Sequence, residues 1–262
     1  MKSRKIIIHA GFHKTGTTSL QQNLRANRAV LRPDIRLVLR PGMTALCESA
    51  RAYSRSREDY DLGLVKYEAA LLVEKLQNET ASTIIISSED LSGHMPGRHR
   101  LHGYGAAPHL MGAMVMAFKT AAPDDAITFF FTIRTREAWL RSCYVQHLRA
   151  ARMIWDEADY MKRMKTSADF AAIIDQIKRE VPECEVLTTS LEEHTARPLG
   201  IAEALLDLLA LDEKRRAAMV PSALRTSALP ADIQAQLLAL NRSDLDTAEL
   251  KKAKRALIEG AT

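Results

Sequence analysis

The sequence has few of the features that mark secreted or membrane-spanning proteins. Only three of its 262 residues are cysteines, an odd number, and they lie far apart at Cys47, Cys143 and Cys184. Such usage favours reduced thiols in a cytosol over a disulfide framework or a zinc site. No stretch approaches the roughly 18 consecutive apolar residues of a membrane span, and "MKSRK" leads into a short apolar run without the hydrophobic region of a signal peptide. We therefore expect a soluble, cytoplasmic protein without a membrane span.

The sequence also lacks a strong charge of one sign. Its 37 basic and 32 acidic residues give a net charge of +5, and aromatic residues make up only 5% of the chain. The basic excess is spread out, without the dense basic tracts and interleaved aromatics of nucleic-acid-binding proteins. Internal repeats and low-complexity segments are absent as well. We expect no nucleic-acid partner, and a small polyanion suits the mild positive charge better.

What the sequence does contain is an alternation of apolar runs with helical patterns. This alternation is typical of a parallel β-sheet with crossover helices. The predicted strands are Lys5–Ala10, Ile35–Leu39, Thr83–Ser87, Ala126–Ile133 and Cys184–Thr189. Apolar residues recur at helical spacing in Tyr60–Gln77, Arg136–Arg152, Ala168–Arg179 and Ile201–Leu211, and in two helices between Pro230 and Leu257. We expect a three-layer α/β/α fold with a central, mainly parallel sheet.

The length fits one domain over residues 1–262, with terminal helices at about 228–262 packed on it. One long segment, Ser92–Pro108 ("SGHMPGRHRLHGYGAAP"), is rich in glycine and proline and has no periodicity. Loops of this length inside compact domains often act as lids or binding loops. We expect this loop to form part of the wall of a substrate site.

The clearest sign of function follows the first strand, in "KIIIHAGFHKTGTTSLQQNL". A glycine-rich turn between a strand and a helix aims backbone N–H groups and the positive helix end at one point, which makes an anion site. Gly11 and Gly16 have the spacing of the nucleotide-triphosphate loop G-x-x-x-x-G-K-[ST], but Thr17 stands where that loop has its lysine. The lysine is Lys14, three residues earlier. The sequence therefore predicts a phosphate-like ligand held without the usual lysine contact.

A second motif closes the longest predicted strand, in "FFFTIRTREAWLRSCYVQHL". Arg134 stands at the strand end, where α/β sheets bind ligands, and its planar guanidinium matches a phosphate. Ser142 follows eight positions later, about two turns into the next helix. Whether Ser142 faces Arg134 depends on how the chain enters that helix, and a surface salt bridge of Arg134 is the plainer alternative.

These motifs resemble those of the sulfotransferases that use 3′-phosphoadenosine 5′-phosphosulfate (PAPS). "GFHKTGTTSL" is similar to the 5′-phosphosulfate loop of that family, and members hold the 3′-phosphate with an arginine and a serine spaced like Arg134 and Ser142. The family's usual proline just after the arginine is absent here, with Arg136 in its place. "LRTSALPADIQAQLLALN" resembles the entry to the terminal helices of bacterial members, with Arg225 where a basic residue is common.

The resemblance implies a P-loop NTPase-like fold, PAPS as the donor, adenosine 3′,5′-bisphosphate (PAP) as the product, and no metal. It also implies a set of residues that hold the donor. They are His13, Lys14, Thr15, Gly16, Thr17, Thr18, Arg134, Ser142 and Arg225.

Sulfuryl transfer to a hydroxyl requires one group that takes up a proton and another that stabilises the charge on the departing phosphate. Lys14 fits the second role. Glu89, in "IIISSEDLSG", follows a predicted strand at the same sheet edge and is the preferred base, as in carbohydrate sulfotransferases that this segment resembles. His94 and His13 are alternatives, because the usual histidine pKa of about 6.5 is closer to neutrality than the usual glutamate value of about 4.3.

Two further interpretations concern the same region. "SSED" is also what a strand end followed by a short capped helix looks like, with Ser88 or Asp90 as the cap. His99 and His102 have H-x-x-H spacing beside His94, but they lack acidic or cysteine partners, so we expect no metal site.

The sequence therefore predicts an enzyme that transfers a sulfuryl group from PAPS to a hydroxyl acceptor, a carbohydrate, other glycan or small metabolite. One alternative is a P-loop kinase of a small molecule, which would use ATP and Mg²⁺ and would need a lysine at the Thr17 position. Another is a non-catalytic nucleotide-binding module that keeps the loop but lacks the base. The acceptor and the oligomeric state stay open.

Overall fold

The computed structural model describes residues 3–223 and 229–260. The chain divides into two compact units, which are described separately. Among the described residues, the first unit comprises 3–134 and 169–223, and the second comprises 135–168 and 229–260. The expected single domain with the terminal helices packed on it stays a prediction. No helix in the described part of the chain is long and apolar enough to cross a membrane.

The first unit is built on a five-stranded sheet in the order β2-β3-β1-β4-β5, and every neighbouring pair of strands is parallel. The strands are β1 (Lys5–His9), β2 (Ile35–Leu39), β3 (Thr83–Ser87), β4 (Ala126–Ile133) and β5 (Glu185–Ser190). Each predicted strand is present, with its ends shifted by one residue at most. The carboxyl ends of all five strands therefore lie at one edge of the sheet, with β1 in the centre.

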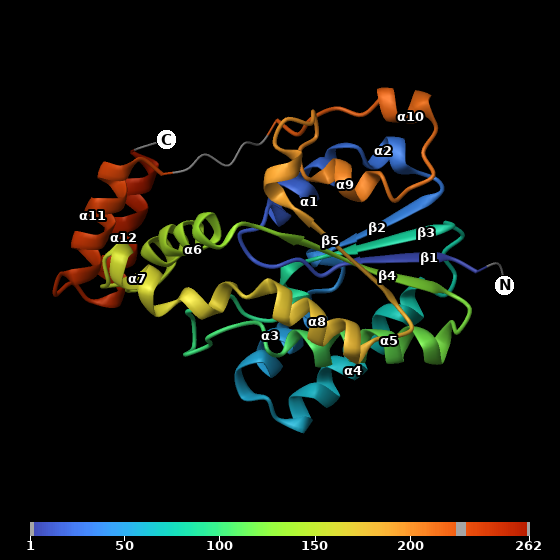
Figure 1. Cartoon of the computed structure of the whole chain (residues 1–262), viewed down its shortest axis with the longest axis horizontal. Coiled ribbons are helices and arrows are strands. Elements are labelled where there is room, and N and C mark those ends of the chain that lie inside the picture. The colour runs from blue at the N-terminus through green and yellow to red at the C-terminus, as the bar shows by residue number, and fades with distance from the viewer. Residues whose placement is uncertain (1–2, 224–228, 261–262) are drawn as a thin grey trace. The chain divides into compact units, whose positions relative to one another are not determined.

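Helices cover both faces of this sheet (Figure 1). On one face lie α1 (Thr17–Ala26), α2 (Arg28–Leu31) and α9 (Ala202–Leu206), with α10 (Glu213–Ala217) beyond them. On the other face lie α3 (Thr44–Ser56), α4 (Asp59–Leu76), α5 (Ala107–Ala121) and α8 (Phe170–Glu180). The predicted three-layer α/β/α architecture is confirmed.

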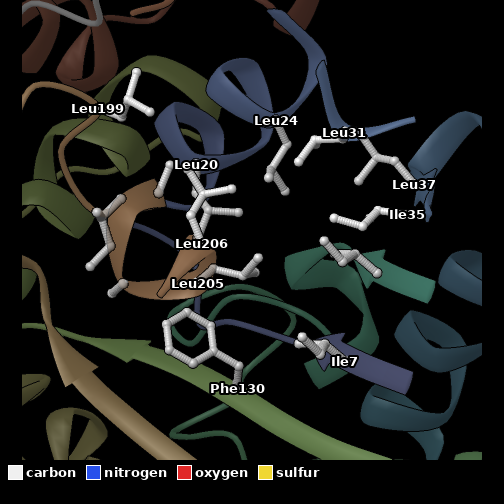
Figure 2. Packing of buried hydrophobic residues seen from close by; sticks show 14 residues of the cluster. Ile7, Leu20, Leu24, Leu31, Ile35, Leu37, Phe130, Leu199, Leu205 and Leu206 are labelled. Atoms are coloured by element: carbon white, nitrogen blue, oxygen red, sulfur yellow. The ribbon is translucent and has the colours of Figure 1, made fainter. Parts of the chain in front are cut away.

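The side chains of the strands alternate between two apolar cores, because successive residues of a strand point to opposite faces. Ile7 of β1 and Phe130 of β4 point toward α1 and α9, where they meet Leu20, Leu24 and Leu205 (Figure 2). The next residues along the strands are equally buried on the other face of the sheet; they include Ile6, Ile8, Ile84, Ile86, Phe129 and Phe131. A parallel sheet covered on both faces needs such continuous apolar strands.

The helix expected over Ile201–Leu211 is much shorter than its apolar pattern indicated. It ends at Leu206, because the N–H groups of Leu208 and Leu209 bond to carbonyls only three residues back and tighten the chain into turns. Leucines of this segment still pack on the core, so their apolar character reflects burial rather than a continuing helix.

The second unit is helical and contains α6 (Arg136–Ala150), α7 (Glu157–Arg163), α11 (Ala231–Arg242) and α12 (Thr247–Glu259). The two predicted terminal helices are thus confirmed. Asp246 and Glu249 form a reciprocal capping box at the start of α12. Within this unit Lys254 Nζ donates to the carbonyls of Leu148 and Ala151 at 2.7 Å each, which ties α12 to the end of α6.

Candidate functional site

The candidate site lies at the carboxyl edge of the sheet, where the chain leaves β1 and β3. After β1 the chain passes to α1 on one face, and after β3 it passes to α5 on the other face. The connections of two adjacent strands therefore diverge, and such a switch point is where α/β sheets bind ligands. The residues that follow these two strands are the candidates for binding and chemistry.

The turn after β1 has a backbone that requires its glycines. A Cβ atom on Gly11 would lie 2.6 Å from Cγ2 of Thr17 and 2.8 Å from Nε2 of His9. Gly16 has φ 93°, a left-handed conformation, and stands at the N-cap position of α1 without a side-chain cap. Lys14 is also left-handed, with φ 67°. The first N–H groups of α1 are therefore presented by a tight turn, as an anion site requires.

Thr15, one of the predicted donor-binding residues, has its side chain turned into the protein. It is fully buried, its hydroxyl donates to the carbonyl of Phe12 at 2.6 Å, and its Oγ1 lies 2.8 Å from Oγ1 of Thr132 on β4. Only the backbone of Thr15 can thus serve an anion. Thr17 is nearly buried, whereas Thr18 is exposed and can offer its hydroxyl to a ligand.

His13 is held between the long loop and the turn after β3. Its backbone N–H donates to the hydroxyl of Tyr104 at 2.9 Å, and its Nε2 lies 3.6 Å from Oδ1 of Asp90. Tyr104 belongs to the predicted loop, and its ring also lies 4.6 Å from that of Phe12, centroid to centroid. The segment between Ser92 and α5 is indeed without regular structure, and Tyr104 ties it to the turn after β1.

The 3-10 turn η2 (Glu89–Ser92) carries the preferred base. Oε2 of Glu89, which is half-buried, accepts a hydrogen bond of 2.9 Å from Nε2 of Gln21 on α1. Oγ of Ser88 accepts a bond from the N–H of Asp90 at 3.2 Å, so the helix-cap interpretation of "SSED" is confirmed. The cap is Ser88, and the candidate base Glu89 is left facing α1.

Asp90, next to Glu89, is held as a carboxylate. Burial by itself raises the pKa of this carboxyl, but its contacts with His13 and Arg40 outweigh burial and lower the pKa to about 2. Nε of Arg40 donates to Oδ2 of Asp90 at 2.7 Å. Asp90 is therefore charged at neutral pH and already paired with arginine side chains. This makes it a less suitable base than Glu89.

His94, an alternative base, is buried. Its Nδ1 lies 3.4 Å from Nε of Arg51, and its backbone N–H donates to Oγ of Ser54 at 2.9 Å. Burial, together with the charge of Arg51, lowers the pKa of His94 to about 4. The imidazole is therefore neutral at pH 7, and the nitrogen that faces Arg51 is already accepting a hydrogen bond.

The residues predicted to hold a 3′-phosphate are only partly assembled in the described structure. Arg134 follows β4, and its Nε lies 3.4 Å from Oε1 of Glu192 without making a hydrogen bond to any described residue, although that atom is buried. Ser142 lies on α6 of the second unit, so its pairing with Arg134 stays a prediction. Arg225 lies outside the described residues.

His9, at the end of β1, is a site residue that sequence reasoning missed. It is fully buried, its Nδ1 lies 2.8 Å from Oγ of Ser87, and its Nε2 has no hydrogen-bond partner among residues 3–223 and 229–260. Burial lowers its pKa to about 3. The signal in the sequence was a polar residue near the end of the apolar run "IIIHA", two positions before Gly11, whose missing side chain leaves room for the imidazole.

No protein-family model matches the chain, and no curated protein matches it. Among solved structures, the chain is similar to a sulfotransferase from Alicyclobacillus acidocaldarius, with 16% identity, 97% of this chain and 96% of that chain covered, and a TM-score of 0.46. In the described part of the chain, no group of three or more His, Cys, Asp or Glu side chains is placed to hold a metal ion. The chemistry of the site has to be inferred from the residues of this chain.

Proposed function

We propose that this protein is a sulfotransferase that moves a sulfuryl group from PAPS to a hydroxyl of a carbohydrate or small metabolite in the cytoplasm. The proposal is carried by one observation. A tight left-handed turn presents Lys14 and the start of α1 at the sheet edge, and Glu89 from the turn after β3 is hydrogen-bonded to the same helix. An anion site and a candidate base thus share one structural element.

The residues present suit a ligand with several anionic groups. Nothing larger than hydrogen fits at Gly11, and the left-handed Gly16 opens an uncapped helix, so the turn can accept phosphate oxygens on its N–H groups. Lys14 and the exposed Thr18 add a cation and a hydroxyl. Arg134, whose buried Nε is paired with Glu192 at 3.4 Å without a hydrogen bond, offers a planar guanidinium for a second phosphate.

PAPS, when bound, supplies a sulfuryl group already activated by its bond to phosphate. In this proposal Lys14 places its ammonium beside the oxygen that remains on the phosphate and stabilises the charge that develops there. Glu89 takes the proton from the acceptor hydroxyl as that oxygen bonds to sulfur and the old sulfur–oxygen bond breaks. Gln21 holds the Glu89 carboxylate in position for this transfer.

The kinase alternative finds less support in the site. Thr17 occupies the position of the kinase lysine, and it is only 3% exposed, with its methyl group packed against Gly11. Lys14 precedes Gly16, whereas the kinase lysine follows it. The backbone of Lys14 is left-handed, whereas Thr17 is the first residue of helix α1. A lysine that spans the β and γ phosphates from the start of the helix is therefore missing.

Ligand-induced thermal stabilisation tests the proposal. PAP should raise the melting temperature, whereas ADP with Mg²⁺ should not, because a ligand stabilises only the fold that binds it. Stabilisation by ADP with Mg²⁺ and none by PAP would overturn the proposal in favour of a kinase. A screen of hydroxyl acceptors with labelled PAPS then separates the enzyme from a module that binds PAP without turnover.

A further inference from the structure

Two arginines from different elements meet on one carboxylate beside the candidate base. Arg40 opens the 3-10 turn η1 (Arg40–Gly42) directly after β2, and Arg51 lies on α3. Nε of Arg40 lies 2.7 Å from Oδ2 of Asp90, and Nε of Arg51 lies 3.9 Å from Oδ1 of the same residue. Asp90 therefore orients both guanidinium groups at the carboxyl edge of the sheet.

The ends of both guanidinium groups stay available. Among the described residues, each hydrogen bond of the Arg40 and Arg51 side chains runs through Nε, and the side chains are 43% and 33% exposed. Arg4 shows what a structural arginine looks like in this fold. It is only 10% exposed and uses Nε and both terminal nitrogens, on Asp125 and on the carbonyl of Leu76.

Among the described residues, the two arginines outnumber the carboxylates in ion-pair contact with them. Asp90 is the one carboxylate in ion-pair contact with Arg40 or Arg51 in the described part of the chain, and it also faces His13. His94, the other neighbour of Arg51, is a neutral imidazole and offsets none of the charge. Two guanidinium groups thus share one contacting carboxylate, and Glu48 adds a weaker negative charge that acts on Arg40 from a longer range.

The residue that holds Arg40 and Arg51 lies next to the candidate base in the sequence. Asp90 directly follows Glu89, and its second contact, His13, directly precedes Lys14. The two guanidinium groups are therefore held by the residue next to the candidate base, in the turn that follows β3.

We propose that Arg40 and Arg51 form an anion subsite and that the acceptor is a hydroxyl compound carrying an oxyanion, such as a sugar acid or a sugar phosphate. The two planar guanidinium groups offer paired N–H donors, which match the oxygens of carboxylate, phosphate or sulfate. This inference deepens the proposed function and rests on it for the role of the bound molecule as acceptor. The anion subsite itself is independent of that role.

Calorimetry with three related sugars tests the subsite. In the presence of saturating PAP, which occupies the phosphate-binding turn, glucuronate and glucose 6-phosphate should bind at least about tenfold more tightly than glucose, since the difference is a charged hydrogen-bonding group. Glucuronate binding alone would identify a carboxylate as the preferred anion, and glucose 6-phosphate binding alone a phosphate.

Arg40→Gln and Arg51→Gln should each weaken binding of the anionic sugar about tenfold, and Arg51→Lys should weaken it less because it keeps the charge. Arg36→Gln is the matched control. Arg36 also pairs through Nε with one carboxylate, Glu79, at 3.0 Å, and is 38% exposed, so the same change of charge is made away from the subsite. The control should keep wild-type affinity.

Equal affinity for glucose and the anionic sugars, or equal losses in Arg36→Gln and Arg51→Gln, would overturn the subsite. The proposed function fails separately, if PAP does not bind while the anionic sugars still bind in an Arg51-dependent way. A protein that binds PAP but does not discriminate anionic from neutral sugars keeps the proposed function and loses the subsite. Thermal melts of each variant show whether it is folded.

Discussion

Gln21 donates a hydrogen bond of 2.9 Å from Nε2 to Oε2 of Glu89, and this contact joins the helix after β1 to the turn after β3. Since α1 also begins directly after the glycine-rich turn that follows β1, the carboxylate contacts the same helix that this turn opens. In the proposed function, a shift of α1 would move the turn and the carboxylate together and would keep a bound donor and the base in register.

The first prediction concerns this carboxylate. Glu89→Gln should lower kcat by about two to four orders of magnitude if Glu89 is the base, and should leave PAP affinity unchanged because the amide keeps the shape of the side chain. Gln21→Ala should lower kcat less, since Glu89 stays present but loses its positioning contact. Steady-state kinetics with PAPS and an acceptor measure both. Normal turnover in Glu89→Gln with a loss in His94→Gln would assign the base to His94 instead.

Lys14 is expected to act mainly in the transition state. Lys14→Ala should lower kcat by about two to three orders of magnitude, the scale for removing one electrostatic donor, with a smaller change in PAPS binding. Lys14→Arg keeps the charge but places it differently, so it should recover binding more than rate. Single-turnover kinetics and calorimetry separate the two effects, and near-normal turnover in Lys14→Ala would contradict the assignment.

Arg134 should increase the affinity only for nucleotides that carry a 3′-phosphate. Arg134→Ala is expected to weaken PAP binding by about 1.5 to 3 kcal/mol, as for a hydrogen bond to a charged group, and to leave binding of adenosine 5′-phosphosulfate almost unchanged. Glu192→Gln is the matched change on the other side of the ion pair, and it should not weaken PAP binding, because Glu192 competes with the phosphate for Arg134. Equal losses for both ligands in calorimetry would refute the role of Arg134.

The buried imidazole of His9 should make the free energy of unfolding depend on pH. Burial lowers the pKa of the folded protein's His9 to about 3, whereas the unfolded chain binds a proton near the usual value of 6.5. The unfolded state therefore binds more protons between these values, so the free energy of unfolding falls as the pH drops below 6.5. Between pH 6.5 and pH 5 the loss from His9 is about 2 kcal/mol.

Urea unfolding at pH 7 and pH 5 measures this loss. His9→Gln should show a smaller loss than the wild type, because glutamine does not titrate, while the contribution of His94 stays the same in both proteins. A variant that keeps the full pH dependence would show that His9 is not a buried neutral imidazole.

The strands were predictable because a parallel sheet buried on both faces needs unbroken apolar runs. Several helices were not predicted, and α3 and α5 show why. The buried face of α3 places the short side chains of Cys47, Ser49, Ala50 and Ser54 beside Leu46 and Tyr53, which weakens its apolar pattern. α5 begins within the glycine- and proline-rich segment, and Pro108 stands in its first turn, where proline is favourable to a helix and yet is easily taken for a loop residue.

The tight backbone turn after β1 was predictable from local sequence, whereas the contacts that depend on packing were not. The positions of Gly11, Lys14 and Gly16 in one short stretch indicated an anion-binding turn. The inward orientation of the Thr15 side chain depends on its contact with Thr132, which is far away in the sequence. The hydrogen bond between Gln21 and Glu89 also joins distant segments and could not be predicted from sequence alone. The meeting of two arginines on Asp90 likewise requires three segments that are separate in the chain.

The central position of β1 has a consequence for how the protein is made. β1 is synthesised first, yet it pairs only with β3, which begins at Thr83, and with β4, which begins at Ala126. At ribosomal rates of about 5 to 20 residues per second, its apolar edges wait on the order of ten seconds for both partners. Pairings this distant in sequence also slow the folding of the finished chain. The strand that leads into the glycine-rich turn is thus exposed to aggregation during synthesis and is a candidate target for a chaperone that binds nascent chains.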